Sequence, residues 1–157
     1  MSSLKYPLNL DPDAVHSIRL LYVTVANDEG DWPSFMHSHH FTELFYVKSG
    51  CGRLLVEDQS IPIEKDDLII VNPNTAHTEC SDPRQPLSYI TIGVEGLNFS
   101  FQKEKEYSIF NCAKVKDNLL FYFNSMLSEM EHQADGYQEI CISMLNILTI
   151  HLKRITH

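Results

Sequence analysis

The chain of 157 residues has few basic residues for its length and no dense basic cluster. Its 12 lysines and arginines stand against 21 aspartates and glutamates, which gives a formal net charge of −9 at pH 7. A protein that holds a phosphate backbone needs a cluster of positive side chains on one surface. We therefore expect that this chain does not bind DNA by itself.

Cysteine pairs and long apolar runs are also absent. Cys51, Cys80, Cys112 and Cys141 are widely spaced and include no Cys-x-x-Cys pair, which argues against a zinc ribbon, a thioredoxin-like site and a secreted disulfide framework. Residues 1–13 lack the charged start and apolar run of a signal peptide, and no segment is apolar enough to span a bilayer. The sequence thus predicts a cytoplasmic protein with free thiols and no membrane partner.

What the sequence does contain is a β-rich part followed by a helical part. Short β-rich runs, separated by turn-forming residues, predict a small antiparallel barrel or sandwich. After about residue 110, apolar residues recur at helical spacing and predict two antiparallel helices joined by a short polar link. The expected strands are 18–25, 41–48, 52–56, 68–71 and 87–94, and the expected helices are 114–130 and 137–154.

One compact domain with three parts follows from this order of patterns. We expect an amino-terminal arm over 1–12, a β-barrel over 13–110 and a helical pair over 111–157. Each helix carries more apolar surface than one wall of a barrel needs. The surplus indicates either a dimer interface or a cover over the open end of the barrel.

The most specific pattern is His37-x-His39 followed by Glu43. Side chains of a strand alternate between its faces, so these three residues share one face. A later β-rich run ends in Pro73 and Asn74, a turn that directs His77 towards the same place. Three imidazoles and one carboxylate suit one divalent transition metal, namely Mn, Fe, Co, Ni, Cu or Zn. The alternative is that no cofactor binds and the four side chains form hydrogen bonds.

The two motifs together resemble those of the cupin superfamily. The segment from His37 to Glu43, with Gly50 after it, is similar to the first cupin motif, and residues 65–77 are similar to the second. Asp66 and Asn74 stand where the family usually has glycine. The resemblance implies an antiparallel jelly-roll barrel whose metal ligands are His37, His39, Glu43 and His77.

A narrower resemblance is to the effector-binding and dimerisation domain of AraC-type transcription regulators. That family has an arm, a cupin barrel, two antiparallel helices and then a helix-turn-helix domain. The resemblance implies a small-molecule effector, sugar-like or another polar metabolite, and a homodimer formed through the carboxy-terminal helices. No basic recognition helix precedes His157, so DNA would be bound only through a domain absent from this chain. The alternatives are a truncated sensor module or a natural single-domain relative.

Aromatic residues near the motifs are candidates for the ligand-binding wall. Trp32, Phe35, Tyr46 and Tyr22 supply flat apolar faces beside the polar His37, His39, Glu43 and His77, a mixture that suits a polar ligand. Glu79 shares the face of His77 if that strand continues, which makes it a candidate general base, but the favoured interpretation is a surface carboxylate. His40 is expected to point away from the cavity.

Two other functions are compatible with the same residues. If the four ligand residues hold a metal, the chain is a stand-alone metal-dependent cupin enzyme or a sugar-binding cupin. If they hold neither metal nor ligand, they form an internal polar network in a barrel that only dimerises. No nucleophile motif is present, so we assign no catalytic residue.

Overall fold

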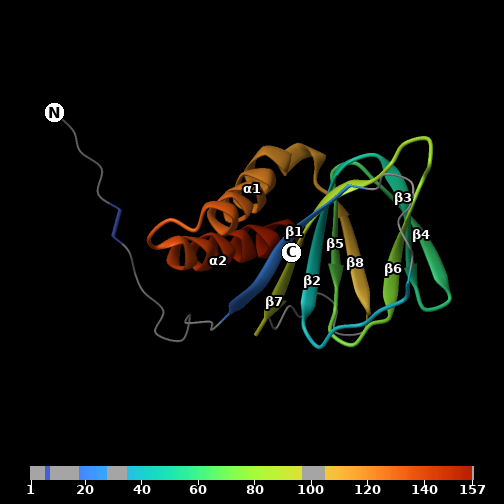
Figure 1. Cartoon of the computed structure of the whole chain (residues 1–157), viewed down its shortest axis with the longest axis horizontal. Coiled ribbons are helices and arrows are strands. Elements are labelled where there is room, and N and C mark those ends of the chain that lie inside the picture. Colours follow the sequence, from blue (N-terminus) through green and yellow to red (C-terminus); the bar gives the residue numbers. More distant parts are fainter. Residues whose placement is uncertain (1–5, 8–17, 28–34, 97–104, 157) are drawn as a thin grey trace.

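The computed structural model describes residues 6–7, 18–27, 35–96 and 105–156 (Figure 1). Within these ranges, eight strands are followed by a 3-10 helix and two α-helices. The strands are β1 (Arg19–Asn27), β2 (Thr42–Ser49), β3 (Cys51–Val56), β4 (Gln59–Glu64), β5 (Asp67–Val71), β6 (His77–Ser81), β7 (Ser88–Glu95) and β8 (Tyr107–Asn111). The helical elements are η1 (Ala113–Val115), α1 (Lys116–His132) and α2 (Tyr137–Thr156).

The strands form two antiparallel sheets. The larger has the order β1-β7-β2-β5-β8, and the smaller has the order β4-β3-β6. Strands that are distant in the sequence are neighbours in both sheets, as in a jelly roll. The predicted fold class, a mainly β cupin-type jelly roll followed by two carboxy-terminal helices, is confirmed.

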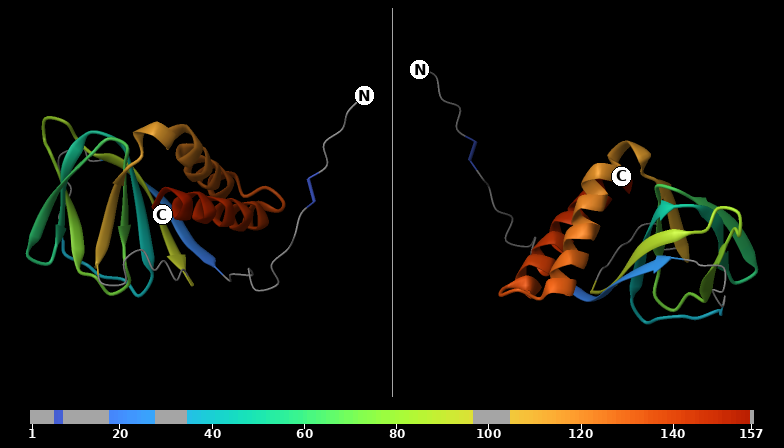
Figure 2. Two further views of the ribbon diagram at one scale, coloured as in Figure 1. Left: turned by 180° about the vertical axis from the view of Figure 1, so that it is seen from behind. Right: turned by 45° about the horizontal axis from the view of Figure 1, so that its top comes forward.

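The helical pair covers the outer face of the larger sheet, and the smaller sheet lies on its inner side (Figures 1 and 2). Strand β2 shows how one strand serves both layers. Leu44 and Tyr46 pack in a core shared with α1 and α2, whereas Phe45 and Val47 pack in a second core between the sheets. Alternation of side chains along the strand produces this division, and it explains why β2 is apolar on both faces.

The sequence missed β4, β6 and β8 as strands. Two of them, QSIPIE and HTECS, form the edges of the smaller sheet. The third, YSIFN, forms an edge of the larger sheet beside β5. All three are short, β4 contains Pro62, and β6 consists largely of polar residues, which weakens the strand signal in the sequence. Neither helix in the described part of the chain is long and apolar enough to cross a membrane.

Candidate functional site

The fold brings together the four residues of the two motifs. One ligand atom from each of His37, His39, Glu43 and His77 lies within 4.8 Å of the others. A pair of backbone hydrogen bonds fixes the two segments to each other: the amide of His37 donates to the carbonyl of His77 at 3.0 Å, and the amide of His77 donates to the carbonyl of His37 at 2.9 Å. The cluster is therefore held by backbone pairing as well as by its side chains.

The turn before His77 contributes a further backbone contact. Asn74 has a left-handed φ of 63°, a conformation that asparagine tolerates better than most residues. Its amide donates to the carbonyl of His39 at 2.6 Å. The substitution of asparagine for the usual glycine of the motif is thus compatible with the turn that the site needs.

Hydrogen bonds to backbone carbonyls orient two of the imidazoles. Nδ1 of His37 lies 2.9 Å from the carbonyl oxygen of Phe35, and Nδ1 of His77 lies 2.8 Å from that of Thr75. A carbonyl only accepts, so each Nδ1 carries the hydrogen and each Nε2 keeps its lone pair. This is the tautomer and the outer-shell contact found in histidines that bind metals.

The Nε2 atom of His77 provides a test of whether a metal fits. It is buried and has no hydrogen-bond partner, and it lies 3.9 Å from Oε1 of Glu43, too far for a hydrogen bond. An unpaired buried nitrogen is costly. A cation bound among the four side chains would satisfy it, so the donor set and its geometry fit a divalent metal ion.

Glu43 is the charged centre of the cluster. Nε2 of His39 lies 2.8 Å from its Oε2, and the hydroxyl of Tyr22 donates to the same oxygen at 2.9 Å. Burial opposes the charge of Glu43, but His77, Tyr22 and His39 outweigh burial and lower its pKa. Burial together with Glu43 raises the pKa of Tyr22, which keeps its hydroxyl protonated as the donor. The carboxylate is thus held in the form that a cation requires.

The pKa values of His39 and His77 are shifted in opposite directions. Burial lowers the pKa of His39. For His77, burial also opposes the charged form, but Glu43, the Thr75 carbonyl and Glu79 outweigh it and raise the pKa. A metal ion would have to displace any proton from these rings, because it binds the neutral imidazole.

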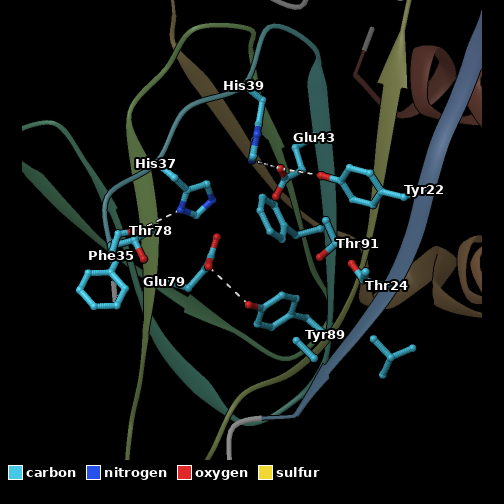
Figure 3. A pocket seen from close by; sticks show the side chains of 13 residues that line it. Tyr22, Thr24, Phe35, His37, His39, Glu43, Thr78, Glu79, Tyr89 and Thr91 are labelled. Carbon is cyan, nitrogen blue, oxygen red and sulfur yellow. Dashed lines mark hydrogen bonds and ion pairs between the residues drawn. The ribbon is translucent and has the colours of Figure 1, made fainter. Parts of the chain in front are cut away.

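The cluster lies at one end of a cavity of about 630 Å³ between the two sheets (Figure 3). His37, His39 and Glu43 line this end, and Glu79 and Tyr89 point into the cavity from other strands. The remaining walls are apolar side chains and threonines, namely Val25, Ala26, Phe35, Phe45, Thr24, Thr78 and Thr91.

The aromatic candidates from the sequence have different positions. Tyr22 and Phe35 line the cavity, and Trp32 lies outside the described residues. Tyr46 faces the other way: it is fully buried beside Phe123 in the core under the helices, and its hydroxyl donates to Asp66 at 3.0 Å. The prediction that Tyr46 contacts the ligand was wrong, because residues 43 and 46 of one strand project to opposite faces.

Glu79 was also misjudged from the sequence. It is 6% exposed and lines the cavity, whereas the sequence indicated a surface carboxylate. The alternation that pairs it with His77 on one face was available as a signal. Tyr89, Thr91 and Phe45 were missed as cavity residues, because nothing in a single sequence distinguishes a cavity wall from a packed core. His40 is exposed, and its Nε2 lies 3.5 Å from Glu95, away from the cluster.

Comparison with known proteins agrees with this geometry. Residues 21–93 match the family model described as the cupin domain. The matched segment includes all four residues of the cluster. The resemblance that the two motifs indicated is therefore confirmed.

One sequence relative of this chain is described as a regulator, and the chain spans only part of its length. It is 28% identical over 81 residues to the uncharacterized HTH-type transcriptional regulator YdiP of Escherichia coli K12, an alignment that covers 51% of this chain and 27% of that protein. Its fold is similar to that of unsaturated fatty acid bound wild-type ToxT from Vibrio cholerae, with a TM-score of 0.55, 12% identity, and coverage of 87% of this chain and 56% of ToxT. Apo ToxT K231A has a TM-score of 0.52 at 15% identity, with coverage of 80% and 51%.

Gly93 provides a test of the link between Tyr22 and Glu43, because it pairs with both residues across the larger sheet. A Cβ at this position would lie 2.5 Å from Cε1 of Tyr22 and 3.0 Å from Cε2 of Phe41. We expect Gly93→Ala to displace the Tyr22 ring and to lower the free energy of unfolding by about 1–3 kcal/mol. Urea denaturation measures this change.

The control for this prediction is a double-mutant cycle with Tyr22→Ala. Removal of the ring removes the clash, so Gly93→Ala is expected to cost less in the Tyr22→Ala protein than in the wild type. Equal costs in the two backgrounds would show that the Tyr22 ring does not limit position 93.

Proposed function

We propose that this chain is the effector-binding and dimerisation module of an AraC-type transcription regulator, with a small polar metabolite, sugar-like or similar, as effector. The observation that carries the proposal is a cavity of about 630 Å³ lined by polar and apolar side chains, in a chain related to an HTH-type regulator. A ToxT structure of similar fold contains an unsaturated fatty acid, which supports a small-molecule role for such a chain. DNA would be bound by a domain outside the present chain.

Strand β1 is the element through which the cavity would affect the helices. Tyr22 and Thr24 form part of the cavity wall, whereas Leu20 and Val23 pack in the core shared with α1 and α2. The strand is at the edge of its sheet and pairs only with β7 among the described strands. A ligand that moves Tyr22 would therefore move residues that support the helical pair.

The helical pair offers a surface for a second copy. Ile140, Ile142, Ile147 and Ile150 of α2 are 38–50% exposed, and Phe121 of α1 is 59% exposed. Several exposed large apolar residues on one helix are typical of an interaction surface. A homodimer formed through the helices would cover them.

We expect Ile147→Glu combined with Ile150→Glu to convert a dimer into a monomer, because the interface would then have to bury unpaired carboxylates. Analytical ultracentrifugation of the protein gives the oligomeric state. Asn124→Glu, at an exposed position of α1, is the matched control and should leave the dimer intact. A wild-type protein that is monomeric at all concentrations would contradict the dimerisation part of the proposal.

The product of the native gene tests the regulator assignment directly. We expect a product longer than this chain, with a basic helix-turn-helix segment after the helical pair, since neutralising phosphates requires such side chains. Intact-mass spectrometry of the protein made from its own gene measures this length. A product that ends at His157 would contradict the regulator assignment and leave the metal site as the main hypothesis.

A metal-dependent enzyme or sugar-binding cupin is the second candidate, and the four converging ligand atoms favour it. His37, His39, Glu43 and His77 would hold one divalent ion, which when bound supplies Lewis-acid chemistry to a ligand in the cavity. Tyr22 would position Glu43 through its hydrogen bond, and Phe35 and Thr75 would orient two imidazoles.

Metal content distinguishes the two candidates. An enzyme should purify with about one metal per chain, and His77→Ala should abolish binding, because the buried Nε2 of His77 is a central ligand atom. Inductively coupled plasma mass spectrometry measures the content, with His40→Ala, an exposed histidine outside the cluster, as control. Protein that contains no metal and takes up none of added Ni²⁺ or Zn²⁺ would contradict the enzyme alternative.

A further inference from the structure

Helix α2 carries a regular stripe on the face that it turns away from the core. Its five members are three or four residues apart and therefore lie on one side of the helix, namely Ile140, Ser143, Ile147, Ile150 and Arg154. All five are exposed, and the three isoleucines are 38–50% exposed. Leu145, Leu148 and Leu152 on the opposite side pack in the core under the helices. The helix is thus apolar on two sides, and the described part of the chain covers only one of them.

Helix α1 shows that exposure alone does not produce such a stripe. It lies beside α2 on the outer face of the same sheet (Figures 1 and 2). Its own exposed line is polar apart from one phenylalanine and consists of Asp117, Phe121, Asn124, Ser128 and Glu131. A helix face in water is normally polar, as that of α1 is. The three isoleucines of the α2 stripe therefore indicate a second surface that covers this helix.

Residues of opposite charge lie at the two ends of the stripe. Glu139 is in the first turn of α2, next to Ile140, and Arg154 is in the last turn. Both are exposed, and neither forms an ion pair with another described residue. The stripe is therefore acidic at one end and basic at the other, with an apolar middle.

Two copies of α2 match each other in charge when they lie antiparallel. With Ile147 at the centre, the first turn of each helix then meets the last turn of the other, so Glu139 faces Arg154 of the second copy at both ends. A parallel arrangement would instead place Glu139 beside Glu139 and Arg154 beside Arg154, where like charges repel. The helix dipoles favour the same choice, because the positive amino-terminal end of one helix lies beside the negative carboxy-terminal end of the other.

We infer that the stripe of α2 is the seam of a homodimer in which two α2 helices pack antiparallel, with the isoleucines buried between them and Glu139 paired with Arg154 of the second copy at each end. The inference rests on the proposed function and deepens it, because it assigns the helix, the face and the orientation of the dimer. At about 1.5 Å per residue, the 20 residues of α2 place the carboxy-terminal ends of the two helices about 30 Å apart. DNA-binding segments after the helices would then begin at opposite ends of the seam.

Charge reversal at the two ends of the stripe tests the orientation. Glu139→Arg or Arg154→Glu alone turns both attractive contacts into repulsive ones, so we expect the Kd of the dimer to rise about three- to tenfold. The variant with both substitutions exchanges the charges, re-forms both ion pairs and keeps the net charge of the wild type. Its Kd should return to within about twofold of the wild-type value. Sedimentation equilibrium in low-salt buffer measures these values, because exposed ion pairs are least screened there.

Glu64→Arg is the matched control, since it changes the net charge as Glu139→Arg does but lies at an exposed position of β4, on the smaller sheet. It should leave the Kd unchanged. Single reversals that leave the Kd unchanged would overturn the antiparallel seam, as would a double reversal that weakens the dimer further instead of restoring it. A wild type that is monomeric at all concentrations would overturn the dimerisation part of the proposed function as well, whereas a dimer that is insensitive to the reversals contradicts the orientation alone.

Discussion

The buried carboxylate of Glu43 is the constraint on which the rest of the site depends. A charge between two sheets must be compensated by hydrogen bonds or by opposite charge. Here His39 and Tyr22 contact one oxygen, and His77 lies 3.9 Å from the other. These partners come from the loop before β2, from β1 and from β6. The groups that compensate the charge of Glu43 therefore come from both sheets, including the edge strands β1 and β6.

The same arrangement relates the cavity to the helices. Because side chains alternate along β2, Glu43 and Phe45 face the cavity while Leu44 and Tyr46 face the core under α1 and α2. Strand β1 repeats this division with Tyr22 on one side and Val23 on the other. The cavity wall and the core under the helices are therefore formed by neighbouring residues of the same strands. A displacement of β1 or β2 at the cavity would also displace residues that pack against the helical pair.

The ligand atoms of the cluster suit a cation, because they are imidazole nitrogens and a carboxylate kept in its charged form. Three of the four residues also line the cavity, beside apolar side chains and threonines. A metal-dependent enzyme would use the cluster as a metal site next to its ligand. A sensor would use the same histidines as hydrogen-bonding walls of the cavity.

The sequence by itself determined a β-rich part, two helices after it and the four members of the cluster, because alternation along strands, helical spacing and two short motifs are local patterns. The jelly-roll topology was implied only by the resemblance of the two motifs to those of cupins. The sequence did not determine the short edge strands β4, β6 and β8, each of five or six residues. Only the tertiary structure decided that Tyr46 faces the helices, that Glu79 and Tyr89 meet across the two sheets, and that Gly93 lies between Tyr22 and Glu43. These contacts join residues from different strands, and the register and packing that create them are properties of the whole fold.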